Sequence, residues 1–268
     1  TGLSSGFEVE DEQYASFGLD QRSGINLATT SRVSRDLSLD LKYGLTESER
    51  NQLGSVTNSY KQDWPEAQFT LSGLERFRIF GGDPQDRDSG WFSASSINIS
   101  YKKTKTVNNY TAISYNPNKT WSIGPRWTMT FHSGFSATLN ATISKDDNRT
   151  NGISTLNRKS RYGLQLRHQL NAQTFLAKLG LYRPGSSQSV NMDVDMSYQR
   201  DRTERTNPGG TPSAPQGLDR LSINPRFSYQ ITRNLSGAVR FIFSRSKNVA
   251  TSVTTTTFGL GVEATFVF

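Results

Sequence analysis

The last eleven residues of the chain alternate between apolar side chains and mostly small or polar ones. Phe258, Leu260, Val262, Ala264, Phe266 and Phe268 fall on one face, and Gly259, Gly261, Glu263, Thr265 and Val267 fall on the other. A period of two residues predicts a β-strand with one apolar face, because successive side chains of a strand point to opposite sides. Similar alternation recurs in segments 91–105, 161–170 and 189–200, a shorter strand is marked by Phe69 and Leu71, and a weak one precedes Gly18. The sequence therefore predicts an all-β protein.

Several of the alternating segments are long for a soluble sheet. They extend over ten or more residues, whereas soluble strands average about five or six residues and a tilted strand that crosses a bilayer needs about nine to eleven. Only 33% of the residues are hydrophobic, yet 11% are aromatic. A transmembrane β-sheet accounts for both values, because it needs apolar residues only at every second position. We therefore expect an antiparallel transmembrane β-barrel and keep a soluble adhesin-like β-sandwich as the alternative.

Three segments align without gaps, and each predicts a β-hairpin. They are residues 25–43, 123–141 and 223–241, spaced 98 and then 100 residues apart. Each has two alternating runs around a polar turn, which is Arg35-Asp36, Ser133-Gly134 or Arg233-Asn234. Asp, Asn and Gly favour tight turns. Because proline cannot donate to a ladder, Pro125 and Pro225 predict bulges near one rim of the sheet.

The whole chain, residues 1–268, is predicted to be one barrel domain or barrel segment of about 11–12 meandering strands. Tight turns join the strands at one end, and long polar loops near 46–63, 145–152 and 201–219 join them at the other. Two excursions near 73–90 and 171–187 fall on the tight-turn side. Outer-membrane barrels have short periplasmic turns and longer extracellular loops. We therefore expect a bacterial outer-membrane protein with its C-terminus at the periplasmic face.

The alternation also divides the side chains into two groups with different roles. One group is expected to face a hydrated lumen: Arg226, Arg240, Gln165, Arg167, Asn191, Asp193 and Asp195. Aromatic residues near strand ends are expected to form girdles at the membrane–water interfaces, where such side chains concentrate. These are Trp91, Trp121, Trp127, Tyr162, Tyr198, Tyr229 and Phe268.

The sequence offers little that could support catalysis or nucleic-acid binding. The net charge is +8, but the Lys and Arg residues are dispersed and form no basic stripe with interleaved aromatics. The absence of cysteine excludes disulfides, thiolate catalysis and zinc–thiolate sites. His132 and His168 are predicted on the turn side, away from the outer mouth where a barrel hydrolase would carry its site. Asp146-Asp147-Asn148 lacks the spacing of an EF-hand loop. We expect no enzyme, no cofactor, no metal and no nucleic-acid partner.

Several motifs resemble the C-terminal region of the SprA family, the outer-membrane translocons of the type IX secretion system. The similar segments are 63–75, the hairpin 223–229 with 235–237, and the terminal strand 258–262. The resemblance extends from about Gly24 to Phe268, and it departs from the family pattern where Trp64 precedes Pro65. Family members are much longer and form a barrel of about 36 strands, the largest known.

The resemblance implies that this chain forms part of a protein-translocation pore. Its implied partners are outer-membrane lipids, lipopolysaccharide, secreted protein cargo, and either other translocon subunits or the rest of a larger barrel. Since the chain starts at Thr1 without a leader-like segment, we expect a mature protein or a piece of a longer one. The alternatives are a self-contained porin of about twelve strands for ions or small solutes, an outer-membrane enzyme, and the soluble sandwich.

Overall fold

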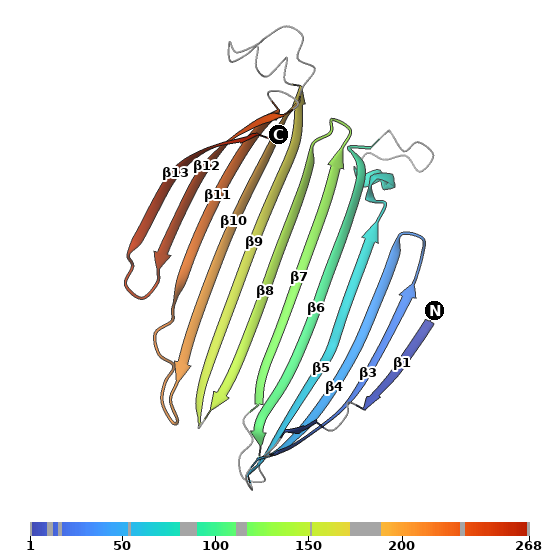
Figure 1. Ribbon diagram of the computed structural model, residues 1–268, viewed down its shortest axis with the longest axis vertical. Helices are drawn as coiled ribbons and strands as arrows, with labels where there is room; N and C mark the ends of the chain where they lie inside the picture. Colours follow the sequence, from blue (N-terminus) through green and yellow to red (C-terminus); the bar gives the residue numbers. More distant parts are fainter. Residues whose placement is uncertain are drawn as a thin grey trace.

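A computed structural model describes residues 2–9, 13–15, 18–52, 55–80, 90–110, 117–150, 152–171, 189–230 and 234–266. These residues form one antiparallel sheet (Figure 1). The strands are β1 (Gly2–Val9), β2 (Gln13–Ala15), β3 (Gly18–Arg32), β4 (Leu37–Gln52), β5 (Ser55–Ser72), β6 (Phe92–Tyr110), β7 (Pro117–Phe131), β8 (Ser136–Thr150), β9 (Ile153–Asn171), β10 (Ser189–Thr206), β11 (Gln216–Gln230), β12 (Leu235–Asn248) and β13 (Thr254–Phe266).

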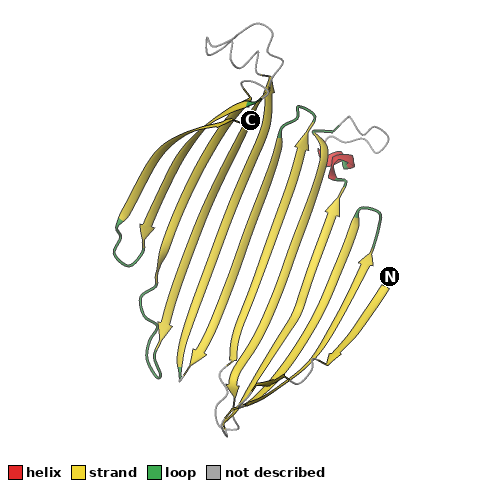
Figure 2. Ribbon diagram, viewed as in Figure 1, coloured by secondary structure: helices red, strands yellow, loops and turns green. Residues whose placement is uncertain are grey.

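The sheet is a simple meander in which, from β3 to β13, each strand pairs with its neighbours in sequence. It has 13 strands, and all of them except β2, which pairs with β3, lie on one path from β1 to β13. The predicted all-β, antiparallel, meandering architecture is confirmed. Two 3₁₀ turns, η1 (Leu74–Arg76) and η2 (Arg78–Phe80), lie in the connection between β5 and β6 (Figure 2). Within the described residues, no helix has the length and apolar character needed to span a membrane.

The three aligned segments form three hairpins, as predicted. They are β3–β4, β7–β8 and β11–β12. The first two connections are longer than the predicted two residues, since 33–36 and 132–135 separate the strands. In the second, the amide of Phe131 donates to the carbonyl of Phe135 at 2.8 Å and Gly134 adopts a positive φ of 75°. In the third, residues 231–233 lie outside the described residues.

The predicted polar loops are corrected, because most of their residues belong to strands. β4 continues to Gln52 and β5 starts at Ser55, while β8 and β9 are separated only by 151–152. Among the described residues, 207–215 forms the longest connection at this end of the sheet, which we call the loop end. The strands continue into segments with mostly polar side chains on both faces. The alternation of apolar and polar residues therefore ends before the strand does. Of the two predicted excursions, 73–80 contains η1 and η2, and 172–188 lies outside the described residues.

The predicted bulges at Pro125 and Pro225 are wrong. The registers Ile123↔Ile143 and Arg126↔Asn140 are continuous across Pro125, and Ile223↔Phe243 and Arg226↔Arg240 are continuous across Pro225. Each proline therefore leaves a gap in the ladder without adding a residue. The register shifts instead at Trp64 and Pro65, between Asp63 and Glu66 of β5.

The sheet is open at both edges. β1 pairs with β3 and β13 pairs with β12, and no register joins β1 to β13 within the described residues. The two edge strands lie on opposite sides of the molecule in Figure 1. The edges therefore carry backbone groups without a strand partner among these residues.

Candidate functional site

The pairing registers place apolar side chains on one face of the sheet, in a band that we call the apolar belt. Cross-strand pairs such as Leu41↔Ala67, Leu139↔Leu164 and Val239↔Val262 continue it from strand to strand. Many of its side chains are exposed, although Met129 of β7 and Ala137 of β8 are buried in a cluster against which Phe80 of η2 packs. Phe258 is 75% exposed, Leu260 67% and Val262 74%. A continuous exposed apolar surface marks contact with a partner or a membrane.

The height and tilt of the belt match a bilayer. In β7 the apolar positions extend from Trp121 to Phe131, about 33 Å along the strand at 3.3 Å per residue. For a strand tilted by about 40° this corresponds to about 25 Å along the membrane normal, the usual height of the apolar band of an outer-membrane barrel. The pairing register shows this tilt. The row of paired residues that starts at Tyr101 of β6, within the belt, passes through Ser160 of β9 and reaches Lys247 of β12, which lies beyond the loop-end edge of the belt.

Aromatic side chains lie along the loop-end edge of the belt. Tyr162 and Tyr198 stack with ring centroids 6.4 Å apart, and Trp121 occupies this edge on β7. Tyr43 and Trp64, which the sequence analysis did not include, meet edge to face at 5.8 Å. The sequence did not predict this pair, because the register shift at Trp64 changes which residue of β4 lies opposite Trp64.

The other predicted girdle residues lie toward the opposite end, the turn end. Trp127 donates from Nε1 to Ser95 Oγ at 2.8 Å and packs against Phe80 and Phe92 beneath η2. Trp91 precedes β6 and is 65% exposed, and Tyr229 lies near the end of β11. Phe268 lies outside the described residues.

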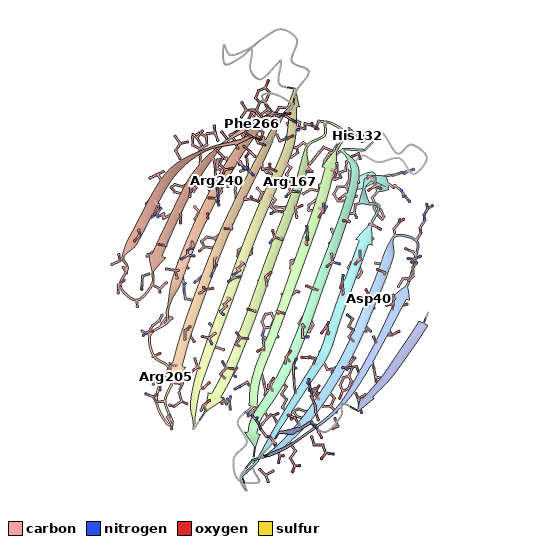
Figure 3. All side chains as sticks on the ribbon, viewed as in Figure 1. Asp40, His132, Arg167, Arg205, Arg240 and Phe266 are labelled. Atoms are coloured by element: carbon pink, nitrogen blue, oxygen red, sulfur yellow. The ribbon has the colours of Figure 1, made fainter. Side chains whose placement is uncertain are left out.

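The seven residues predicted to line a lumen share the opposite, polar face. Asp193 pairs in register with Arg167 on one side and with Arg226 on the other, and Arg226 pairs with Arg240. Asp195 pairs with Gln165, and Asn191 lies two residues before Asp193 on the same strand. Figure 3 shows Arg167 and Arg240 in the same half of the sheet as His132 and Phe266, while Arg205 lies at the loop end.

Ion pairs balance part of the charge on this face. Arg167 Nε lies 3.4 Å from Asp193 Oδ1, and Arg226 Nη2 donates to Glu263 Oε2 at 2.8 Å. Arg226 and Glu263 border an open hollow of about 470 Å³ whose other lining includes Asn191, Ser228 and Thr265. The lining is polar, so the hollow suits water and ions more than an apolar ligand.

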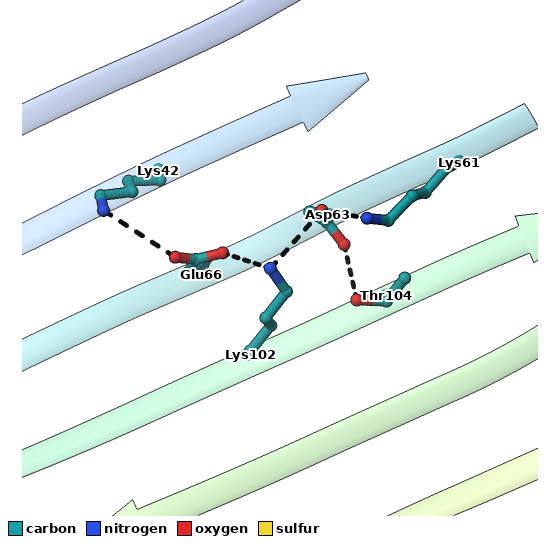
Figure 4. A network of polar contacts seen from close by, with 6 residues as sticks. All are labelled: Lys42, Lys61, Asp63, Glu66, Lys102 and Thr104. Atoms are coloured by element: carbon teal, nitrogen blue, oxygen red, sulfur yellow. Dashed lines mark hydrogen bonds and ion pairs between the residues drawn. The ribbon is translucent and has the colours of Figure 1, made fainter. Parts of the chain in front are cut away.

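The densest polar network lies on the same face of β4, β5 and β6 (Figure 4). Lys102 Nζ donates to Glu66 Oε2 at 2.7 Å and lies 3.5 Å from Asp63 Oδ2. Thr104 Oγ1 donates to Asp63 Oδ1 at 2.6 Å, Lys61 Nζ lies 3.4 Å from Asp63, and Lys42 Nζ lies 4.0 Å from Glu66. The network therefore joins three strands through alternating charges.

The register shift at Trp64 and Pro65 creates this network. In a regular strand Asp63 and Glu66, three residues apart, would point to opposite faces. Because Trp64 and Pro65 together oppose a single residue on each neighbouring strand, the shift adds one extra residue between Asp63 and Glu66. Both carboxylates therefore reach the polar face, while Trp64 meets Tyr43 on the other. The alternation pattern does not predict this network, and the Trp-Pro dipeptide between two acidic residues is the sequence signal that indicates it.

The two histidines lie toward the turn end of the sheet, as predicted. His132 lies in the β7–β8 connection, and the ring of His168 packs 5.9 Å from Phe135. No group of three or more His, Asp or Glu side chains within the described part of the chain could hold a metal ion. The polar face carries charged and hydroxyl side chains, and the opposite face carries the apolar belt.

Comparison with known proteins adds little to this description. No family model matches the chain, and no curated protein matches it. Among solved structures, the chain is similar to the crystal structure of the beta domain of the Bordetella autotransporter BrkA, at 9% identity and a TM-score of 0.29, covering 99% of this chain and 96% of that one. A likeness at this TM-score assigns neither a fold nor a function.

Proposed function

We propose that this chain forms part of the wall of a wide protein-translocation pore in a Gram-negative outer membrane, of the kind used in type IX secretion. The observation that carries the proposal is the open sheet, with an apolar belt on one face and charged side chains on the other. The belt would contact lipid, and the polar face would line the lumen.

The open edges argue for a larger wall. In lipid, each unsatisfied backbone group costs several kcal/mol, so a membrane sheet has to close or be continued. Twelve strands are enough to close a barrel, yet no register joins β1 to β13 within the described residues. Further strands, from another part of the same protein or from another subunit, would complete the wall.

The width of the pore decides what can pass. With strands 4.8 Å apart and tilted by about 40°, a closed barrel of twelve strands is about 24 Å across between backbones, before its side chains fill part of that space. A barrel of about 36 strands would be about 70 Å across. A folded domain of about 100 residues has a radius of gyration of about 13 Å, so only the wider wall would pass folded cargo.

The polar face suits such a lumen. Ion pairs such as Arg167–Asp193 and Lys102–Glu66 keep charge on the wall hydrated and partly balanced. A balanced wall would bind a passing protein weakly, which a translocation channel requires.

The orientation of the sheet follows from the same proposal. β13 descends from the loop end, so Phe266 lies at the turn end together with His132 (Figure 3). If the turn end faces the periplasm, as short turns do in outer-membrane barrels, the C-terminal strand ends there.

Disulfide trapping tests whether the sheet closes on itself. The chain has no cysteine, so Thr257→Cys on β13 can be paired with cysteines placed in turn along β1, in cells and in the native membrane. We expect no disulfide bond between Thr257→Cys and a cysteine at any position of β1. A Thr257→Cys bond to any β1 position would show a closed barrel and overturn the proposal.

Conductance of the chain alone provides a second test. We expect no uniform channel in a planar bilayer, because the wall is incomplete. A small, stable and uniform conductance would favour the self-contained porin and contradict the translocation pore.

A further inference from the structure

Three lysines surround the indole of Trp121 on the face of the sheet that carries the apolar belt, which we call the outer face. They lie just beyond the loop-end edge of the belt. Lys103 of β6 and Lys145 of β8 both pair in register with Trp121 of β7. Lys119 lies two residues from Trp121 on β7, so it points to the same face. We call Lys103, Lys119 and Lys145 the lysine triad.

The spacing of the triad allows its ammonium groups to meet one ligand. Neighbouring strands lie about 4.8 Å apart, so the backbones of Lys103 and Lys145 are about 10 Å apart across β7. Lys119 lies about 6.6 Å from Trp121 along the strand. Lysine side chains are long and flexible enough for three of them to converge on one phosphate or on two adjacent ones.

The triad has no acidic partner within the described residues. Lys103, Lys119 and Lys145 make no ion pair there, and residues 89–145 contain no Asp or Glu at all. Asp147 faces Lys119 in register, but Arg149 lies 3.8 Å from it and Ser154 Oγ donates to it at 3.2 Å. Like charges at neighbouring positions repel, so an anion from outside the chain would stabilise this part of the sheet.

Two arginines on the next strands contrast with the triad. Beyond the same edge of the belt, Arg158 of β9 lies 3.5 Å from Glu204, and Arg202 of β10 lies 2.7 Å from Asp219. These guanidinium groups already have carboxylate partners. The lysines of the triad differ from these two arginines in having no such partner within the described residues.

The surface below the triad is apolar. Tyr101, Ile123 and Ile143 lie in one row across the same three strands. A ligand held by the lysines would thus have its anionic group in water and its apolar part against the belt. Trp121, between them, has the amphipathic ring that favours a membrane interface.

We propose that the lysine triad binds the phosphate groups of lipid A, the phosphorylated glycolipid of the outer leaflet, with the acyl chains lying on Tyr101, Ile123 and Ile143. This inference rests on the proposed placement of the chain in an outer membrane. It adds a specific lipid site on the loop end of β6–β8, and it requires that end to face the outer leaflet.

Lipid counting by native mass spectrometry tests the site. The pore that contains the chain, isolated from its native membrane with the strands that complete the wall, is placed in phosphatidylcholine nanodiscs with bisphosphorylated lipid A, or with the same lipid after phosphate removal. The triple variant Lys103→Gln, Lys119→Gln, Lys145→Gln is compared with a control that loses three exposed charges from the polar face, Arg126→Gln, Lys159→Gln, Arg161→Gln.

We expect at least tenfold weaker binding of lipid A to the triad variant, a change below twofold in the control, and at least tenfold weaker binding of the dephosphorylated lipid to the unchanged chain. Equal binding by the triad variant and the unchanged chain would overturn the site. Equal losses in both triple variants would also overturn it, since they would reflect net charge alone. Retained lipid binding together with lost assembly with another subunit would identify a protein partner and overturn the lipid assignment.

Protease protection in the same nanodiscs separates this inference from the proposed function. A chain whose strands remain open to protease would contradict the membrane placement itself. A chain that is protected but binds the phosphorylated and dephosphorylated lipids equally would leave that placement intact and overturn only the lipid site.

Discussion

Arg226 and Glu263 form an ion pair that spans a whole strand. Arg226 lies on β11 and Glu263 on β13, and their side chains meet at 2.8 Å over β12, where Ala238 pairs with Glu263. The small side chain between them leaves room for the contact. The pair therefore ties the edge strand β13 to the interior of the sheet on its polar face.

Removing this ion pair should increase the local opening of edge strand β13 without unfolding the sheet. Because Arg226 is 49% and Glu263 53% exposed, we expect Glu263→Gln to cost less than about 1 kcal/mol of the free energy of unfolding. Amide hydrogen exchange should accelerate in β13 while β9 and β10 stay unchanged. Asp193→Asn, which removes a comparable pair with Arg167 inside the sheet, is the control, and faster exchange of β13 in that variant would contradict the local role of Arg226–Glu263.

A charged substitution should lower the free energy of unfolding strongly on the apolar belt and only slightly on the polar face. Leu139→Arg or Val239→Arg should lower the free energy of unfolding in a bilayer by about 2–4 kcal/mol, because an arginine near the midplane would contact lipid. Thr138→Arg, next to Leu139 but on the polar face, should change it by less than about 1 kcal/mol. Reversible unfolding from lipid vesicles measures all three. Equal costs at positions 138 and 139 would contradict the assignment of the two faces.

The Lys102–Glu66 contact should show a modest, salt-dependent coupling. A double-mutant cycle with Lys102→Ala and Glu66→Ala should give a coupling energy of about 0.5–1 kcal/mol, since the Lys102 side chain is 44% and that of Glu66 32% exposed. The coupling should fall as salt rises from 0.05 to about 1 M, because screening shortens the range of the charges. A coupling that salt leaves unchanged would indicate packing rather than charge as its origin.

The sequence predicted the two faces of the sheet because both follow from one simple period. Along the apolar belt, as from Leu37 to Leu45, the alternation of apolar and polar side chains is regular and visible in the sequence. The shared face of Arg167, Asp193 and Arg226 follows from the same parity, combined with the meander of neighbouring strands.

What the sequence did not predict depends on pairing rather than on pattern. Beyond the belt, β4 and β5 continue as strands from 46 to 52 and from 55 to 63, with polar side chains on both faces, so no hydrophobic period marks them. The proline at position 65 shifts a register while those at 125 and 225 do not, since a proline can be accommodated either by a bulge or by a gap in the ladder. The open edges depend on which strands meet, which alternation does not encode.

Two glycines with positive φ allow the cost of backbone strain to be separated from the cost of a contact. Gly73 and Gly134 have φ values of 73° and 75°. A Cβ on Gly73 would lie 3.1 Å from the carboxylate of Asp36, whereas one on Gly134 would meet nothing within 4 Å. Both Ala substitutions should therefore cost about 1 kcal/mol through φ, and Gly73→Ala should cost more because Asp36, which also lies 3.5 Å from Arg76, would have to move. Unfolding midpoints of the two variants and of Gly73→Ala with Asp36→Ala measure the difference. If removing the Asp36 side chain does not narrow the gap between them, the contact is not its cause.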